Sequence, residues 1–505
     1  MGREGDEALE GLRDEAGGDE AVDGLRDEAG RDETGGDETA AGDASDLLVA
    51  LRRDAGDPMR RQLAAELRAA IRAGRLRTGV RLPASRALAA QLGVSRGVVT
   101  DAYEQLGAEG WLAARRGAGT VVAAGPEGAE PAGGPPPARR RVRADFTPTA
   151  PDVAQFPRRL WARAVAHAAE TAPDAALDYG DGHGSAALRE ALAAYLGRVR
   201  GTAAAPGAIV VCAGYHQAIV LLCALLARRG TRRIAFEDPS LPDHWETAAR
   251  AGLEPIAVPV DEGGLRVDAL AATDADAVVV TPSHQYPTGA VMGPERRHAL
   301  LAWARAGGRL VVEDDYEAEF RYDRRALGAL QGLDPAHVAY VGTTAKTLAP
   351  GLRLGWVLAP AGLAPALAAE KLAADHGSPA LDQLALAHLI ETGELDRHLR
   401  RVRRTYAERR AHLVAALTAA IPDGRVEGAA AGVHLVLALP HALDAGRLDA
   451  ALEAEGVVAR TVDAQRRRPA RDARTQLVLG YGRIPAAGID AAVAALARAL
   501  RAARG

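Results

Sequence analysis

Lysine is almost missing from this sequence. Lysine and arginine together number 62 in 505 residues, yet only Lys346 and Lys371 are lysines, and asparagine does not occur at all. Arginine stays protonated, whereas the amine of lysine can lose its proton and form a Schiff base. A lysine that persists in so arginine-rich a chain is therefore a candidate for amine chemistry. We expect Lys346 to be that lysine, with a solvated loop cation as the alternative, and Lys371 to be an ordinary exposed helix residue.

Cysteine and long apolar runs are also scarce. Cys212 and Cys223 are the only cysteines, they form no CxxC pair, and both lie in apolar surroundings. This predicts two buried free thiols in a reducing compartment. The longest apolar run, 218–227, is far shorter than the ~18 residues that a membrane span requires, and the acidic N-terminus has no apolar signal core. We therefore expect a cytoplasmic protein with no membrane partner, and we predict no metal site.

Charge is unevenly distributed along the chain, although the net charge is only −4. Residues 1–45 contain 16 Asp and Glu against 4 Arg, in repeats such as Gly-Leu-Arg-Asp-Glu-Ala-Gly. So polar a segment cannot bury enough apolar surface to offset chain entropy, which predicts a disordered acidic tail. The alternative is an acidic arm that competes with DNA for a basic face. Residues 124–144, rich in Pro, Gly and Arg, are predicted to be a linker.

The pattern of residues 46–123 predicts three short helices followed by two β segments. An amphipathic helix begins at Pro58. Ser85 is expected to cap a second helix, which Gly93 ends, and Ser95 is expected to cap a third. This segment is basic, which suits a polyanionic partner.

A two-stranded wing is predicted after the third helix, over 111–114 and 120–123. Helix, turn, helix and wing is the layout of a winged helix-turn-helix, whose third helix enters the major groove of double-stranded DNA. Arginines and hydroxyls on that side can bind phosphates and base edges. The alternative is a plain helical domain with arginine-rich faces. The predicted DNA-binding residues are Arg86, Ser95, Arg96, Thr100, Arg115 and Arg116.

From residue 145 onward, short apolar strands alternate with helices rich in Ala and Leu. This alternation is typical of a mostly parallel α/β sheet. The large part of this domain is expected over about 175–378. A smaller α+β part, with strands at 433–439 and 476–481, is expected over about 379–505. Buried strands of the large part are predicted at 209–212, 233–236, 277–281, 310–313, 338–341 and 356–359.

The groups that a pyridoxal 5'-phosphate (PLP) site needs occur at the ends of these strands. PLP requires a lysine for its aldehyde, an acid facing its ring nitrogen and a cup for its phosphate. Lys346 follows one strand and Asp314 ends another, and open α/β sheets bind ligands at that edge. Thr343 and Arg353 flank the lysine and suit phosphate contacts. A helix that opens at 214–217 offers free amide groups to an anion.

The N-terminal pattern resembles a known family. Residues 61–122 are similar to the GntR-type DNA-binding domain, with LPASR at 82–86 and LGVSR at 92–96 as matching segments. From Asp145 onward the chain resembles the fold-type I aminotransferases. Nearly the whole chain from Asp46 resembles the MocR subfamily of GntR-type regulators. The segments that carry this last resemblance are 281–289, 313–322 and 342–355.

The resemblance implies roles for individual residues. Lys346 would form an internal aldimine with PLP, Asp314 would pair with the pyridine nitrogen, and Tyr316 would bond the ring hydroxyl. Arg483 would clamp the α-carboxylate of a substrate or effector. The phosphate would be held by Thr343, Arg353, the main chain of Tyr215 and His216, and Tyr179 reaching across a homodimer.

Three residues depart from the aminotransferase pattern. Tyr286 stands where an asparagine usually bonds the ring hydroxyl, as the MocR subfamily tolerates. Leu241 stands where an aromatic ring usually stacks on the cofactor, and Ala345 replaces a common serine before the lysine. These changes leave PLP binding in place, but the loss of the stacking ring weakens the case for efficient turnover.

The two modules together predict a PLP-dependent transcription regulator that binds operator DNA. It would sense PLP, an amine or an amino acid through an aldimine at Lys346, and it would not be a physiological enzyme. The alternative is an active PLP-dependent aminotransferase with an appended DNA-binding domain. A third hypothesis is a scaffold protein whose cofactor site is inactive.

Overall fold

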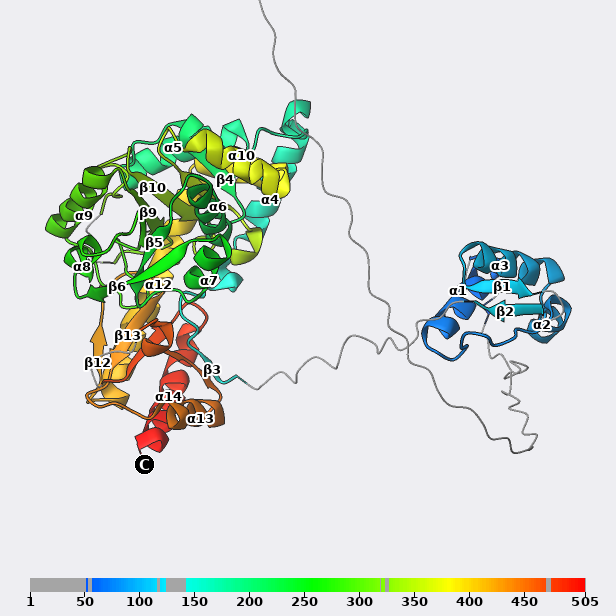
Figure 1. The fold of residues 1–505 in the computed structure, drawn as a ribbon. Helices are drawn as coiled ribbons and strands as arrows, with labels where there is room; N and C mark the ends of the chain where they lie inside the picture. Colours follow the sequence, from blue (N-terminus) through cyan, green and yellow to red (C-terminus); the bar gives the residue numbers. More distant parts are fainter. Residues whose placement is uncertain are drawn as a thin grey trace, which may run out of the picture. The chain divides into compact units, whose positions relative to one another are not determined.

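The computed structural model describes residues 51–52, 57–115, 119–123, 142–317, 319–322, 327–468 and 474–504. The chain forms two compact units, Met1–Ala138 and Arg139–Gly505, which are described separately (Figure 1). The predicted acidic tail over 1–45 lies outside the described residues, and so does most of the predicted linker over 124–144.

The first unit is a helical domain with a two-stranded wing. Leu63, Leu67 and Ile71 recur at helical spacing on the inner face of its first helix and pack in the core of the unit. The two strands of the wing are antiparallel. The predicted winged helix-turn-helix is confirmed, with each wing strand shifted by one residue. The elements are α1 (Met59–Arg72), α2 (Ser85–Leu92), α3 (Arg96–Ala108), β1 (Leu112–Arg115) and β2 (Gly119–Val122).

The two serines that the sequence predicted as helix caps lie in different positions. Ser95 occupies the N-cap position of α3, but its side chain makes no capping hydrogen bond. Ser85 is the first residue of α2 and not its cap, because the helix begins directly after Ala84. The Ser85 hydroxyl instead accepts a hydrogen bond from Arg96 Nε (3.3 Å), which joins α2 to α3. Gly93 ends α2 in the left-handed conformation (φ 62°), as predicted.

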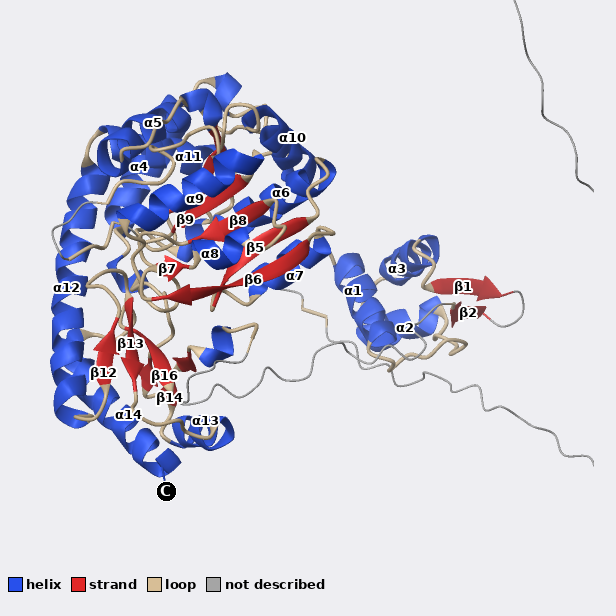
Figure 2. Ribbon diagram, turned by 60° about the vertical axis from the view of Figure 1, so that its left-hand side comes forward, coloured by secondary structure: helices blue, strands red, loops and turns tan. Residues whose placement is uncertain are grey.

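An eight-stranded sheet forms the centre of the second unit (Figure 2). Its order is β4-β11-β10-β9-β8-β5-β6-β7. Strand β11 runs antiparallel to both of its neighbours and β7 runs antiparallel to β6, whereas the other pairs are parallel. The predicted mostly parallel sheet is confirmed. The strands are β4 (Ile209–Cys212), β5 (Arg233–Asp238), β6 (Glu254–Asp261), β7 (Gly264–Leu265), β8 (Ala277–Val280), β9 (Leu310–Asp315), β10 (Val338–Thr343) and β11 (Gly355–Leu358).

Helices cover both faces of this sheet because successive strand residues point to opposite sides. Val210 and Cys212 share a buried core with residues of α6, α7 and α10, whereas Ile209 and Val211 share another with residues of α4, α5 and α11. Helices α8 and α9 complete the second face. The helices are α4 (Arg158–Thr171), α5 (Ala186–Arg200), α6 (Tyr215–Arg228), α7 (Asp243–Arg250), α8 (Val267–Ala271), α9 (Pro294–Gly307), α10 (Ala364–Asp375) and α11 (Ala380–Glu391).

Lys371 is buried, and the expectation that it is an exposed helix residue is wrong. It lies on the inner face of α10 together with Leu367 and Ala368, and its side chain is 0% exposed. Its ammonium group donates to Asp375 Oδ1 (2.6 Å) and Oδ2 (2.7 Å), one helical turn later. The ion pair compensates the buried charge, which is the condition under which a lysine can occupy a core position.

The C-terminal part of the second unit builds its own core on an antiparallel sheet of order β12-β13-β16-β15. The N-terminal segment of the unit joins this core, because Phe146 packs in it and β3 pairs with β14. The elements are β3 (Ala144–Asp145), α12 (Glu394–Ala420), β12 (Arg425–Glu427), β13 (His434–Ala438), α13 (Ala445–Ala454), β14 (Val457–Val458), β15 (Arg460–Thr461), β16 (Gln476–Gly480) and α14 (Ile489–Arg504).

Helix α12 connects the two cores of the second unit (Figure 2). Its Leu395 and Leu399 pack with α11 in the core of the large part, whereas Val402 and Tyr406 belong to the C-terminal core. The change between the parts therefore falls within α12 and not at about residue 379, because α11 packs against α4 and α5.

Both cysteines are free and buried, as predicted. Burial raises the pKa of the Cys212 and Cys223 thiols to about 12, so both are protonated at neutral pH. Across the described ranges, no helix combines the length and the apolar character that crossing a membrane requires.

Candidate cofactor site

A pocket lies at the C-terminal edge of the large sheet. Its walls come from the segments that directly follow β4, β5, β8, β9 and β10, which is the edge where open α/β sheets bind ligands. Of the eight predicted cofactor residues, seven line the pocket: Tyr215, His216, Asp314, Tyr316, Thr343, Lys346 and Arg353. Further lining residues are Thr149, Ser240, Leu241, His244, Thr281, Tyr286 and Ala345.

Asp314 lines this pocket and has a carboxylate oxygen without a hydrogen-bond partner. The residue is 4% exposed, and its Oδ1 atom has no hydrogen-bond partner. Burial, and after it the charge of Asp315, raises the pKa of Asp314 well above its usual value. A buried acceptor without a donor costs free energy. The protonated ring nitrogen of PLP is a donor of the required kind, so this carboxylate fits the cofactor.

Lys346 lies three residues beyond the end of β10. Burial lowers the pKa of its ammonium group, against the opposing charges of Glu317 and Asp314. A lysine with a lowered pKa has more of its amine in the reactive neutral form. Thr343, which is 7% exposed, accepts a hydrogen bond from the amide of Ala345 (3.1 Å) and thereby orders the loop in front of the lysine.

The N-terminus of α6 and Arg353 form a cradle for an anion on one side of the pocket. Helix α6 begins at Tyr215 after Gly214, which has φ 85°, and no side chain caps it. Its first amide groups are therefore free to bind an anion. The guanidinium group of Arg353 donates to the carbonyl of Ala213, and its Nη atoms lie 3.5 Å from the position that a Cβ on Gly214 would take.

His244 is a pocket residue that the sequence analysis missed. Its ring stacks on Phe236, with centroids 5.1 Å apart and planes 25° apart, and its Nε2 lies 2.8 Å from the hydroxyl of Tyr215. Burial lowers the pKa of His244 to about 3, so the ring is neutral. It brings an aromatic ring to the wall where Leu241 replaces the usual one. The signal was its position three residues after Leu241, at the start of α7.

Tyr316 faces the pocket beside Tyr286. The hydroxyl of Tyr316 donates to the main-chain carbonyl of His284 (3.1 Å). The rings of Tyr316 and Tyr286 meet edge to face, with centroids 6.5 Å apart. Burial raises the pKa of Tyr286 to about 12, so its hydroxyl stays protonated.

Two predicted site residues lie outside this pocket. Tyr179 is 86% exposed and lines a separate hollow with His376, whose ring centroid is 6.3 Å away. Arg483 is exposed, and its Nη1 pairs with Asp145 Oδ2 at 3.0 Å. The structure therefore does not bring Tyr179 or Arg483 among the lining residues of the pocket.

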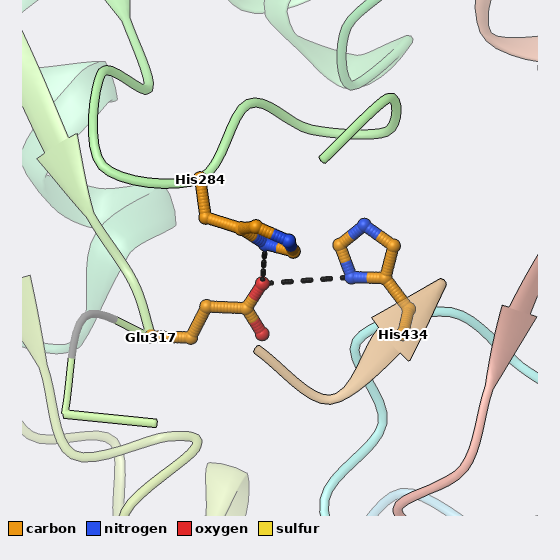
Figure 3. A group of neighbouring side chains, drawn as sticks. All are labelled: His284, Glu317 and His434. Atoms are coloured by element: carbon orange, nitrogen blue, oxygen red, sulfur yellow. Dashed lines mark hydrogen bonds and ion pairs between the residues drawn. The ribbon is translucent and has the colours of Figure 1, made fainter. Parts of the chain in front are cut away.

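A buried cluster is formed by His284, Glu317 and His434 (Figure 3), and Glu317 follows Tyr316 in the chain. His284 Nδ1 is 2.6 Å from Glu317 Oε1, and His434 Nδ1 is 3.5 Å from the same oxygen. Burial alone would raise the pKa of Glu317, but its hydrogen bond to His284 and the charge of that histidine lower it to about 2. The sequence analysis missed this group because His434 is more than a hundred residues from its partners.

Five of the six predicted DNA-binding residues fall within the described part of the first unit, and Arg116 lies outside it. Arg86, Ser95, Arg96 and Arg115 are exposed. Thr100 is half-buried and donates to the main-chain carbonyl of Arg96 (3.0 Å). A hollow between α3 and the wing is lined by Arg96 and Thr100, among others.

A winged helix-turn-helix joined to a fold-type I aminotransferase domain defines a class of DNA-binding proteins. Comparison with family models agrees with both units. Residues 59–122 match the family described as bacterial regulatory proteins, gntR family, and residues 153–497 match aminotransferase class I and II. The chain belongs to the MocR subfamily of GntR-type transcriptional regulators.

Several regulators are similar to this chain over most of its length. The probable rhizopine catabolism regulatory protein MocR of Rhizobium meliloti is 36% identical, over 73% of this chain and 79% of its own. The pyridoxine biosynthesis regulator PdxR of Corynebacterium glutamicum is 35% identical, over 72% and 80%. The regulator TauR of Rhodobacter capsulatus is 34% identical, over 85% and 94%.

Solved structures of aminotransferases share the fold of the second unit. The kynurenine aminotransferase of Pyrococcus horikoshii aligns with a TM-score of 0.65 at 24% identity, covering 72% of this chain and 91% of its own. The multiple substrate aminotransferase of Thermococcus profundus aligns with a TM-score of 0.64 at 26% identity, covering 71% and 91%.

Proposed function

We propose that the protein is a homodimeric regulator that binds PLP at Lys346 and senses an amine, an amino acid or PLP itself in that pocket. The observation that carries this proposal is that one pocket contains both Lys346 and Asp314, whose Oδ1 has no hydrogen-bond partner. PLP, when bound, supplies an aldehyde that reacts with amines and a ring that accepts electrons. The residues that would hold it are Lys346 at the aldehyde, Asp314 at the ring nitrogen, Tyr316 at the ring hydroxyl, and Tyr215, His216, Thr343 and Arg353 at the phosphate.

The effector would compete with Lys346 for the cofactor and bind through its carboxylate to Arg483. In the structure this arginine is paired with Asp145, so binding would exchange one carboxylate for another. Tyr179 would reach the phosphate of the partner subunit. The exposure of Tyr179 and its neighbour Leu177, at 86% and 57%, supports a second copy covering this surface.

Lys346→Arg tests the cofactor part of the proposal. The variant keeps the positive charge but cannot bond to an aldehyde, so it is expected to lose the visible absorbance band that the wild type gains with PLP. Asp314→Asn should instead keep the covalent bond and weaken PLP binding. A wild-type protein that shows no such band with PLP would contradict the proposal.

Gel-shift measurements test whether PLP acts on DNA binding. We expect the affinity of the full chain for its own promoter region to change when PLP or a candidate amine is added, and to stay unchanged in Lys346→Arg. If the protein did not bind that DNA under any condition, the proposal would be wrong.

The second candidate is an active aminotransferase, which the nearly complete pocket and Arg483 favour. Sustained turnover with pyruvate or 2-oxoglutarate as amino acceptor would support it. A single half-reaction that stops after one equivalent would count against it.

A further inference from the structure

The cluster of His284, Glu317 and His434 has the residue types of a metal site but the spacing of hydrogen-bonded groups. Ligand atoms at about 2.0–2.2 Å from a shared zinc ion stand roughly 3.3 Å apart in a tetrahedral site. His284 Nδ1 and Glu317 Oε1 are 2.6 Å apart, which is the distance of a charge-assisted hydrogen bond. The second oxygen, Glu317 Oε2, accepts from the amide of Val433 at 3.0 Å. Protein donors therefore already satisfy both oxygens of this carboxylate.

On one side the cluster reaches the cofactor pocket. The ring of His284 is bonded to Glu317, and the carbonyl of the same histidine accepts the hydroxyl of Tyr316 at 3.1 Å. Tyr316 lines the pocket. Glu317 thus holds the ring of His284 in place, and the main-chain carbonyl of His284 holds the hydroxyl of Tyr316 in place.

On the other side the cluster is joined to the C-terminal part of the unit. Val433 directly precedes β13, and His434, the first residue of that strand, pairs with Gly480 of β16. The amide of Tyr481 donates to the carbonyl of Val433 at 3.0 Å, and Arg483 follows two residues later. This backbone cannot move away from the carboxylate independently of β16, because the ladder of β13 and β16 binds the two strands together.

The large part and the C-terminal part of the second unit are in close contact at Gly432. A Cβ on this residue would lie 2.3 Å from Glu317 Oε1, and its φ of 70° disfavours any other residue. The other ring nitrogen of His434, Nε2, forms a hydrogen bond of 3.2 Å with the carbonyl of Pro287. That bond assigns the ring proton to Nε2 and leaves Nδ1 facing Glu317 without a hydrogen bond. A small displacement of β13 would therefore change the surroundings of the carboxylate directly.

We propose that Glu317 is a positioning residue that links the effector site at Arg483 to the cofactor-facing hydroxyl of Tyr316. This inference rests on the proposed function, because it needs PLP beside Tyr316. When Arg483 leaves Asp145 for an effector carboxylate, β16 and β13 shift together, and Glu317 and His284 follow. The hydroxyl of Tyr316 would then switch its hydrogen bond between two acceptors, the carbonyl of His284 and the ring hydroxyl of the cofactor.

The first test follows the visible absorbance band of the full-length, PLP-loaded protein as a function of pH. A donor aligned on the ring hydroxyl of PLP favours the deprotonated form of that hydroxyl. A misaligned Tyr316 should therefore raise the midpoint, which is the pH at which half of the absorbance change has occurred. Glu317→Gln is expected to raise it by roughly half a unit or more, in the same direction as Tyr316→Phe. Loss of the Glu317 charge would by itself lower the midpoint, because that charge raises the pKa of the Lys346 amine, so a raised midpoint reports the alignment of Tyr316. The double variant should shift no further than Tyr316→Phe alone, because both changes act on one hydroxyl. Glu319→Gln, which removes a nearby carboxyl outside the cluster, is the matched control and should leave the midpoint in place.

The second test uses glycine and methylamine, which differ only by a carboxylate. In the wild type, glycine should perturb the band at lower concentration than methylamine, and Arg483→Gln should remove that preference. Glu317→Gln should reduce the preference several-fold, although residue 317 touches neither probe. Equal effects of glycine and methylamine on the wild type would overturn the link to Arg483.

The outcomes separate this inference from the proposed function. A wild type without a PLP band overturns both. A normal wild-type band together with an unshifted midpoint in folded Glu317→Gln overturns only the inference. If Glu317→Gln does not fold, His434→Gln replaces it, since glutamine keeps a donor toward Pro287 and removes the nitrogen facing Glu317. A stoichiometric zinc content that the variant loses would overturn the hydrogen-bonded assignment of the cluster.

Discussion

The two lysines of this chain occupy opposite environments. Lys346 faces a pocket, and burial lowers the pKa of its amine. Lys371 is fully buried and bonded to Asp375. The proposed chemistry at the first position needs an amine that can lose its proton, which arginine does not offer. The second position holds its ammonium group in a buried ion pair.

Lys371→Met is expected to lower the free energy of unfolding by about 1–2 kcal/mol at neutral pH, less than for a wholly buried pair because Asp375 is partly exposed. Burial opposes ionisation of Asp375, but its hydrogen bonds to Lys371 and Gln217 lower its pKa below the usual value. A carboxyl with a depressed pKa stabilises the fold above its unfolded pKa, and this contribution is lost as the pH falls through its folded pKa. Urea unfolding at several pH values should therefore show the difference from wild type shrinking in acid. A difference that is constant down to low pH would contradict this account.

Residues at strand ends were predictable because their placement depends on local chain order. Asp314, Thr343 and Lys346 end or follow buried strands, and the ends of parallel strands meet at one edge. His244 was not predictable in this way. It reaches the pocket through the first turn of α7, and its position three residues after Leu241 was too weak a signal to predict an aromatic ring there.

At the scale of elements, a close contact between β11 and α6 shapes the anion side of the pocket. A Cβ on Gly355 would lie 2.7 Å from the Cα of Gly214, the residue that precedes α6. Arg353 lies two residues before Gly355 and projects toward Gly214. The glycine in β11 thus sets the distance between the helix N-terminus and the guanidinium group.

Gly355→Ala is expected to weaken PLP binding by tenfold or more. The added methyl group would push the N-terminus of α6 away, and overpacking of this kind costs about 1–3 kcal/mol. Gly351→Ala is the matched control, because nothing lies within 4 Å of a Cβ at that position and its φ is ordinary. Equal PLP affinities of the two variants, measured by fluorescence titration, would show that the contact does not matter.

The buried strands of the large sheet were predictable to within one or two residues, because they are continuous apolar runs. Strand β6, Glu254–Asp261, was not predicted. It carries Pro255 and Pro259 and is only partly buried, so it lacks the pattern of a central strand. Its pairing with β5 in the native sheet outweighs its weak local preference.

At the scale of the whole molecule, the two units divide the chemistry between them. The first unit carries the exposed arginines Arg86, Arg96 and Arg115, and the second carries the pocket that contains Lys346. The proposed regulation requires that events in this pocket alter the affinity of the first unit for DNA.

Arg86→Ala and Arg96→Ala are expected to weaken DNA binding differently in the full chain. Arg86, at the start of α2, is predicted to contact a phosphate, so its loss should weaken binding to all sequences and reduce the salt slope by about 1. Arg96, at the start of α3, should cost about 1–3 kcal/mol and relax specificity if it reads a base. Gel shifts at several salt concentrations on specific and scrambled DNA measure both effects. Arg198→Ala, an exposed arginine of the second unit, is the control, and neither DNA variant should alter the PLP band.

The sequence by itself determined the order of the units, the class of each fold and the strand-end residues of the pocket. Helical spacing, glycine stops and apolar runs are local signals, and they survive without knowledge of the packing. Only the tertiary structure decided that Lys371 is buried, that Arg483 pairs with Asp145, and that Glu317 meets Val433, 116 residues away. Such contacts depend on which faces of distant segments meet, and the free energy of that packing is not encoded in any single segment.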